Sequence, residues 1–208
     1  MKGFDDSYFE HYCKFDNDIV TPYSDSEIRF YGNRDIHKYV YSTYKNLFKK
    51  EPNLYLDLGC GTGEEISYFL DRNITSAGCD ISDYVFNHIN KKAEPFIKKQ
   101  DSVSFLNSFN GKADILMDSV LQYLDDDLFE KQIKLIGEKT NDNCVIGVIY
   151  DWTERNHPYR KQVHQPNWWE SKLKPFGFAN MYNLGIEIVT DNEDYVSEYI
   201  FYKSVKQV

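Results

Sequence analysis

Three glycines, at positions 59, 61 and 63, follow a short apolar segment at two-residue intervals. The apolar segment, Leu54–Leu58, contains one acidic residue, Asp57, and a helix-forming segment, Glu64–Leu70, begins directly after the last glycine. Glycine is needed where the backbone turns with a positive φ angle and where a ligand approaches the chain closely. The pattern therefore predicts a strand, a tight glycine turn and a helix, the opening unit of a nucleotide-binding α/β sheet.

The spacing of these glycines argues against a dinucleotide ligand. A dinucleotide-binding loop has the pattern G-x-G-x-x-G, which would need glycine at position 64, where the chain has Glu64. Glu64 and Glu65 favour the start of a helix through its dipole, but a pyrophosphate at that helix end would lie close to both carboxylates. A nicotinamide-dependent oxidoreductase is therefore a disfavoured alternative.

A second acidic residue, Asp80, ends the next predicted strand, Thr75–Asp80. A carboxylate at this point can accept hydrogen bonds from both hydroxyls of a ribose. The structural alternative is that Asp80 only assists Ser82, which is a good N-cap for the following helix. Because a glycine loop precedes it, we expect Asp80 to bind a ribose.

The elements that position these residues alternate between strands and helices. Strands are predicted at 54–58, 75–80, 103–106, 113–117, 144–150, 181–189 and 195–205, and helices at 64–71, 82–93, 168–173 and after 125–127. This alternation predicts an α/β, Rossmann-like, doubly wound and mostly parallel seven-stranded sheet with helices on both faces. The last two strands are joined by a short turn, so we expect an antiparallel pair at one edge.

The chain is expected to form one domain, 1–208. Its core is residues 54–208, and the preceding segment, 1–53, carries two helical stripes, within 8–19 and 36–48. We expect this N-terminal segment to pack against the sheet or to form a lid over its ligand edge.

Composition excludes several classes of protein. The chain is 41% hydrophobic with a net charge of −9 and has no long basic run, so nucleic acid is not an expected partner. No apolar stretch is long enough to span a membrane, and no signal segment opens the chain, which favours a cytoplasmic location. Four scattered cysteines form no C-x-x-C pair, so we expect free thiols and no metal site.

The run 56–63, Leu-Asp-Leu-Gly-Cys-Gly-Thr-Gly, resembles the first signature of class I S-adenosylmethionine-dependent methyltransferases, and 80–82, Asp-Ile-Ser, resembles their second. The resemblance covers roughly residues 54–205 and implies S-adenosylmethionine as cofactor and S-adenosylhomocysteine as product. It implies that the glycine loop contacts the methionine part, Asp80 the ribose, Asn107 or Ser108 the adenine, and that the segment from Asp118 passes near the methyl group. The cofactor-binding residues predicted in this way are Asp57, Gly59, Cys60, Gly61, Thr62, Gly63, Asp80, Ile81, Asn107, Ser108, Asp118 and Ser119. Many relatives carry an acid after the third strand, where this chain has Asn107 and Ser108, so the adenine contact departs from the pattern.

The methyl acceptor is expected to bind at the loop 151–164, which leaves the carboxyl end of the fifth strand. His157 and His164 are the candidates there for a general base, and His157 is the predicted catalytic residue. The predicted substrate-binding residues are Tyr31, Trp152, Arg155, His157, Tyr159 and Arg160, of which the arginines suit a carboxylate or phosphate. The alternative is a solvated surface loop in which Trp152 is only a packing anchor.

The segment after the fourth strand, Asp118-Ser119-Val120-Leu121-Gln122-Tyr123, lacks the Asn/Asp-Pro-Pro-Tyr pattern of enzymes that methylate amines of bases, and the chain has no Pro-Cys pair. We therefore expect a small polar acceptor, methylated at oxygen, such as a sugar or a phosphorylated or carboxylated metabolite. The alternative is a non-catalytic S-adenosylmethionine-binding scaffold or partner subunit. The sequence leaves the oligomeric state open.

Overall fold

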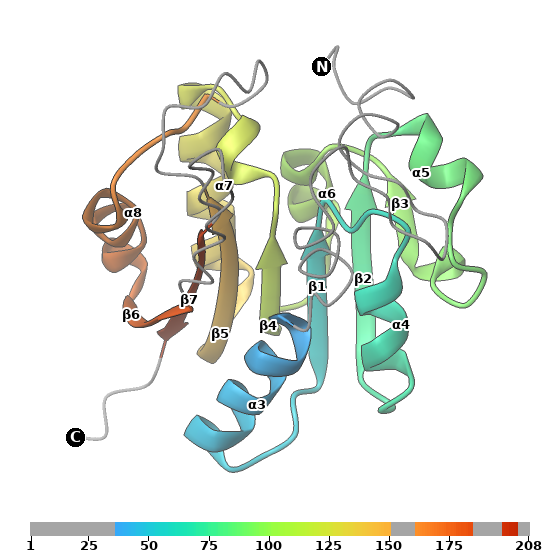
Figure 1. The fold of residues 1–208 in the computed structure, drawn as a ribbon, viewed down its shortest axis with the longest axis horizontal. Helices are drawn as coiled ribbons and strands as arrows, with labels where there is room; N and C mark the ends of the chain where they lie inside the picture. Colours follow the sequence, from blue (N-terminus) through green and yellow to red (C-terminus); the bar gives the residue numbers. More distant parts are fainter. Residues whose placement is uncertain (1–35, 151–160, 185–196, 204–208) are drawn as a thin grey trace, which may run out of the picture.

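The sheet of the computed structural model, which describes residues 36–150, 161–184 and 197–203, has the strand order β3-β2-β1-β4-β5-β7-β6 (Figure 1). The strands are β1 (Leu54–Leu58), β2 (Thr75–Asp80), β3 (Ile97–Lys99), β4 (Ala113–Asp118), β5 (Thr140–Tyr150), β6 (Phe178–Leu184) and β7 (Ser197–Lys203). Strands β1 to β5 form the parallel part of the sheet, and β7 pairs antiparallel with both β5 and β6. The expected α/β Rossmann-like fold with an antiparallel C-terminal pair is therefore confirmed, with a parallel part of five strands.

Helices cover both faces of the sheet (Figure 1). The helices are α3 (Ile36–Phe48), α4 (Glu64–Leu70), α5 (Asp83–Asn87), α6 (Ser102–Ser108), α7 (Asp126–Glu138) and α8 (Pro166–Leu173). Short 3-10 turns, η1 (Glu94–Phe96), η2 (Leu121–Tyr123) and η3 (Lys174–Phe176), complete the connections. Residues of α3 and α4 bury one apolar cluster against the sheet, and residues of α6, α7 and α8 bury the other.

Side-chain caps fix the starts of three helices. Ser82, Asp101 and Asp125 each accept a hydrogen bond from a backbone N–H in the first turn of α5, α6 and α7, respectively. Such a cap satisfies one of the N–H groups that the helix itself leaves unpaired. The predicted cap Ser82 is confirmed, although α5 ends at Asn87 rather than near residue 93, and the helix predicted after 125–127 is α7, capped by Asp125.

The prediction of the third strand is wrong. Residues 103–106 belong to helix α6, and the third strand is Ile97–Lys99, paired with the end of β2. The alternating apolar residues of 103–106 favoured a strand, but the Asp101 cap starts a helix whose buried side chains include Phe105 and Leu106. This shift changes which residues follow the third strand, and therefore which residues face the site.

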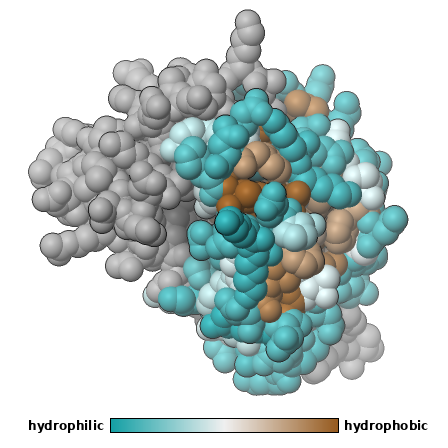
Figure 2. Space-filling view, turned by 90° about the vertical axis from the view of Figure 1, so that its right-hand side faces the viewer, coloured by the Kyte–Doolittle hydropathy of each residue, from teal (hydrophilic) through white to brown (hydrophobic). Residues whose placement is uncertain are grey.

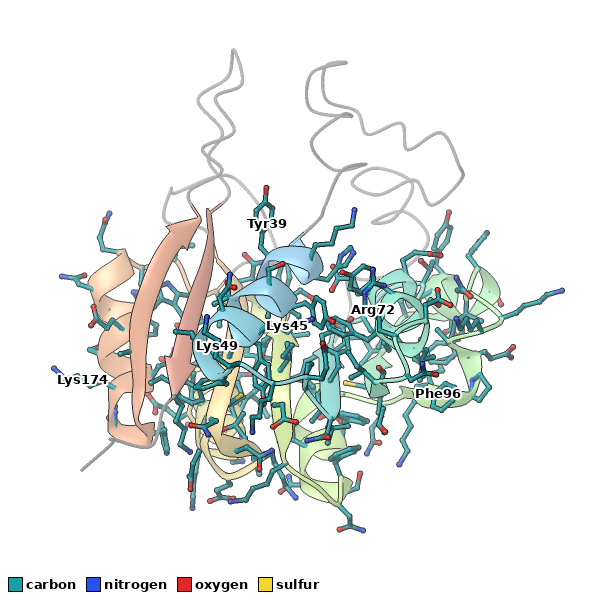
Figure 3. All side chains as sticks on the ribbon, turned by 90° about the horizontal axis from the view of Figure 1, so that it is seen from below. Tyr39, Lys45, Lys49, Arg72, Phe96 and Lys174 are labelled. Carbon is teal, nitrogen blue, oxygen red and sulfur yellow. The ribbon has the colours of Figure 1, made fainter. Side chains whose placement is uncertain are left out.

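Few large hydrophobic side chains are exposed among the described residues. Tyr39 projects from α3 away from the sheet (Figure 3), and it and Phe96 are the exposed large hydrophobic side chains of the described part, at 51% and 41%. In the coloured part of Figure 2, hydrophilic residues surround a group of hydrophobic ones. Within the described ranges, no helix is both long and apolar enough to cross a membrane.

Candidate functional site

The glycine loop 59–63 connects the carboxyl end of β1 to α4. All three glycines have positive φ angles: 76° at Gly59, 51° at Gly61 and 85° at Gly63. The N–H groups of Gly59 and Cys60 both donate to the carbonyl of Cys79 at the end of β2, at 2.9 and 3.1 Å. The loop is thus fixed to the neighbouring strand in a conformation that side chains rarely adopt.

Close packing also requires glycine at both ends of the loop. A Cβ atom at Gly59 would lie 2.6 Å from Ser119 Oγ and 2.7 Å from a methyl group of Val120. At Gly63 it would lie 2.5 Å from the side chain of Ile97. Ser119 completes the contact, because its backbone N–H donates to Leu58 O and its hydroxyl lies 2.9 Å from Gly59 O. The predicted site residues Gly59 and Ser119 are therefore in direct contact.

Asp80 lies at the carboxyl end of β2 and joins two parts of the site. One carboxylate oxygen accepts from Gly61 N at 3.1 Å, and the other accepts from Ser82 N at 2.9 Å. Burial raises the pKa of Asp80, and these backbone hydrogen bonds oppose the rise. Asp80 thus assists the helix cap Ser82, as the alternative to ribose binding expected. The same carboxylate also contacts the glycine loop.

Asp57 lies beneath the glycine loop and is 4% exposed. Its Oδ2 is 3.0 Å from the Tyr55 hydroxyl, which is also 2.9 Å from Glu65 Oε2 in the first turn of α4. Burial, followed by the nearby charge of Glu65, raises the pKa of Asp57 well above its usual range. Sequence reasoning missed Tyr55 and Glu65 as members of this site. Residues 55 and 57 lie on one face of a strand, and this spacing could have linked them.

Asp118, at the end of β4, is completely buried and accepts three hydrogen bonds. The donors are Val120 N at 2.8 Å, Leu121 N at 3.0 Å and Gln132 Nε2 of α7 at 2.6 Å. Burial raises the pKa of Asp118 to about 6 despite these three donors. Its carboxylate therefore fixes the turn after β4 to α7, whereas its neighbour Ser119 contacts the glycine loop.

Asn107 and Ser108 are not at the carboxyl edge of the sheet. They lie in the last turn of α6, where the Ser108 hydroxyl donates to Phe105 O. The chain then reaches Gly111, which packs near Leu54, the first residue of β1. We expected Asn107 and Ser108 to stand directly at the carboxyl end of the third strand. This expectation is corrected, because the segment 103–106 belongs to α6.

The first acidic residue after β3 is Asp101, which follows Gln100. Gln100 N donates to Asp80 O at 2.9 Å, which places Asp101 beside the end of β2. Asp101 Oδ1 accepts from Ser104 N at 2.8 Å. An acid therefore does follow the third strand, and the departure noted in the sequence disappears once the strand is placed correctly. The signal in the sequence was the N-cap pattern Asp101-Ser102-x-Ser104.

The described cysteines, Cys60, Cys79 and Cys144, are free and buried. Cys60 packs in the cluster under α3 and α4, whereas Cys79 packs in the cluster on the other face. Burial raises the pKa of both thiols well above the usual value, which keeps them protonated and unreactive. The prediction of free thiols is confirmed for these three residues. No cluster of metal-binding side chains occurs among the residues with described positions.

The predicted acceptor residues Tyr31, Trp152, Arg155, His157, Tyr159 and Arg160 lie outside the described residues. The end of the loop 151–164 is described, and it is fixed to η2 and α7. Lys161 N and Gln162 N donate to Gln122 O, and the Gln162 amide donates to Leu124 O and Asp126.

His164, the other histidine of the loop, stacks on Trp168 with 3.6 Å between ring centroids. Its Nε2 is 3.0 Å from Gln162 Oε1, and burial lowers its pKa. Trp169 is fully buried against Phe129 and therefore packs α8 onto the core.

This arrangement of sheet, glycine loop and strand-end acids is the fold of class I S-adenosylmethionine-dependent methyltransferases. Solved structures of such enzymes share it. An S-adenosylmethionine-dependent methyltransferase from Archaeoglobus fulgidus is 19% identical, with a TM-score of 0.62 over 86% of this chain and 98% of that one. Magnesium protoporphyrin IX methyltransferase from Synechocystis, solved with bound S-adenosylmethionine, is 20% identical, with a TM-score of 0.60 over 86% and 83% of the two chains. The N-methyltransferase NodS from Bradyrhizobium japonicum is 13% identical, with a TM-score of 0.63 over 83% and 96%. No protein-family model and no curated protein matches the chain.

Proposed function

We propose that the protein is an S-adenosylmethionine-dependent methyltransferase that binds its cofactor across the carboxyl ends of β1, β2 and β3. The observation that carries the proposal is the glycine loop, with three positive φ angles, joined through Gly61 N to the Asp80 carboxylate. Structures of the same fold have been solved with S-adenosylmethionine or S-adenosylhomocysteine bound. These likenesses support the assignment of the cofactor.

The side chains present suit an adenosyl group without phosphates. Asp80 would accept hydrogen bonds from the ribose hydroxyls, and Asp101, rather than Asn107 or Ser108, would lie near the adenine. The acidic first turn of α4, with Glu64 and Glu65, disfavours a pyrophosphate and tolerates a sulfonium cation. When bound, the cofactor supplies an electrophilic methyl group on sulfur.

For the acceptor we retain a small polar molecule methylated at oxygen, such as a sugar or a phosphorylated or carboxylated metabolite, in a cytoplasmic enzyme. His157 would act as general base, and Tyr31, Trp152, Arg155, Tyr159 and Arg160 would contact the acceptor. The proteins of similar fold act on acceptors as different as 1,6-didemethyltoxoflavin and magnesium protoporphyrin IX, so the fold does not indicate the acceptor. The proposed acceptor is based instead on the residues of the loop 151–164.

Titration calorimetry of the purified protein tests the cofactor directly. We expect S-adenosylmethionine to bind and the reduced nicotinamide dinucleotide not to bind. Asp80→Ala should raise the dissociation constant by about tenfold or more, because it removes a charged hydrogen-bond acceptor for the ribose.

Asp83→Ala is the matched control for charge. Asp83 lies three residues further on, is largely exposed and pairs with Lys99 on the surface. Asp83→Ala should leave the dissociation constant for S-adenosylmethionine within about twofold of the wild-type value. A folded wild-type protein that does not bind S-adenosylmethionine would contradict the proposal, and so would an equal loss of affinity in both variants.

A further inference from the structure

The Tyr55 hydroxyl lies between two carboxyl groups under the glycine loop. It is 3.0 Å from Asp57 Oδ2 and 2.9 Å from Glu65 Oε2, both within hydrogen-bond distance. The Tyr55 ring is completely buried and stacks on Phe69 with 3.9 Å between centroids, so the hydroxyl cannot turn away to solvent. The three oxygen atoms are therefore held in one short chain.

A tyrosine hydroxyl has one proton and can donate it to only one of these carboxyls. If both carboxyls were ionised, the other oxygen pair would face each other within 3.0 Å with no proton between them. The contacts are all satisfied when one carboxyl is protonated: it donates to the Tyr55 oxygen, and Tyr55 donates to the second carboxylate. Carboxyls of like charge that are held this close together commonly keep one proton between them.

The charged groups around the chain favour the extra proton. Asp80 on β2 and Asp118 on β4 raise the pKa of Asp57 further through their negative charges. On the other side, α3 contributes His37, whose Nδ1 is 3.8 Å from Glu65 Oε1 and is buried without a hydrogen-bond partner. At 3.8 Å, His37 makes no hydrogen bond to Glu65, although the two side chains are within ion-pair distance when His37 is protonated.

The two carboxyls lie on either side of the glycine loop in the chain. Asp57 is two residues before Gly59, and Glu65 is two residues after Gly63. Tyr55 thus links the strand that leads into the loop with the helix that leaves it. A positive charge brought to this loop acts on both carboxyls and favours their ionised forms.

We propose that Asp57 and Glu65 share one proton through Tyr55, and that this proton is released to solvent when the glycine loop takes up a cationic cofactor. Tyr55 and Glu65 are thus positioning residues that make cofactor affinity dependent on pH and on the charge of the ligand. The second half of the proposal rests on the proposed function, whereas the shared proton belongs to the protein without cofactor. S-adenosylmethionine has a sulfonium charge that S-adenosylhomocysteine lacks, so the two ligands should differ in the proton that they release.

The shared proton is tested first in the protein alone, by infrared spectroscopy at neutral pH. We expect a protonated-carboxyl band that is lost in Glu65→Gln, which leaves Tyr55 free to donate to an ionised Asp57. Glu64→Gln is the matched control, because Glu64 is in the same helical turn, exposed, and bonded to Asn90 instead of Tyr55. The band should persist in this control. A wild-type protein without the band, or a band that Glu65→Gln leaves unchanged, would overturn the proposal.

The coupling is then tested by calorimetry in buffers of different ionisation enthalpy. We expect S-adenosylmethionine to release up to about one proton on binding near neutral pH, and S-adenosylhomocysteine clearly less. In Glu65→Gln this release should vanish for both ligands, and the preference for S-adenosylmethionine should fall by roughly threefold or more. Equal proton release by wild type and Glu65→Gln would overturn the coupling. If neither ligand binds, the proposed function fails and the coupling with it, while the infrared result still decides whether the proton is shared.

Discussion

Two aspartates, Asp57 and Asp118, lie at the carboxyl ends of the neighbouring parallel strands β1 and β4. Both are buried, and burial raises the pKa of both. Their partners differ: Asp118 accepts three hydrogen bonds from donors that have a proton to give, whereas Asp57 shares a single hydroxyl with Glu65.

The difference shows how similar residues at equivalent strand ends take different roles. The donors around Asp118 come from the turn after β4 and from α7, so its carboxylate holds two elements together. The contacts of Asp57 bring it next to another acid, with only the Tyr55 hydroxyl between the two carboxyls. A buried acid with enough donors serves the fold, and one with too few is available to respond to a ligand.

The largest effect is expected when Asp118 is removed. Asp118→Ala leaves Val120 N, Leu121 N and Gln132 Nε2 without their acceptor, and each orphaned buried donor costs about 1 to 3 kcal/mol. We expect a loss of about 3 to 5 kcal/mol in the free energy of unfolding, measured by urea denaturation. Asp101→Ala, which removes the cap of α6, should cost only about 1 kcal/mol. Comparable losses in the two variants would contradict the role given to Asp118.

The next effect is a dependence of stability on pH. The pKa of Asp118 is raised from 3.8 to about 6 in the folded protein, so between these values the folded state binds more protons than the unfolded state. The contribution of Asp118 to stability is therefore greatest below about pH 4 and falls as the pH rises to about 6, by roughly 3 kcal/mol.

Asp118→Asn isolates this contribution. An amide cannot titrate, and it retains an oxygen for Val120 N and Leu121 N, while Gln132 can turn its own amide to face it. The difference in unfolding free energy between the wild type and Asp118→Asn should change with pH between about 4 and 6 and be constant above that range. A difference that is constant throughout would contradict the raised pKa.

The local unit of strand, glycine turn and helix could be predicted because its determinants are adjacent in the sequence. The apolar run, the glycines and the acidic first turn specify β1 and α4 without reference to the rest of the chain. The third strand was misplaced because the apolar spacing of Val103, Phe105 and Leu106 is compatible with a strand or a helix. The Asp101 cap decided in favour of the helix.

The partners of the two buried acids could not be predicted in the same way. The bond between Asp118 and Gln132 depends on how α7 lies against β4, and the contact between Tyr55 and Glu65 depends on how α4 folds back over β1. These distances are set by helix-to-sheet packing, which hydrophobic periodicity does not specify. The positions of ionisable residues at strand ends indicate a site, but their roles follow from the donors that packing brings to them.

The smallest effect is expected at Asp57. Asp57→Ala orphans no donor, because Tyr55 still donates to Glu65 Oε2 at 2.9 Å, and it removes the cost of keeping a proton on the carboxyl pair at neutral pH. The small cavity and the removal of this cost oppose each other, so the free energy of unfolding should change by less than about 1 kcal/mol at neutral pH. Urea denaturation beside Asp118→Ala measures this directly, with the same substitution at a site of similar burial. A loss at Asp57 as large as that at Asp118 would mean that Asp57 also holds the fold together, and the contrast between the two acids would then be lost.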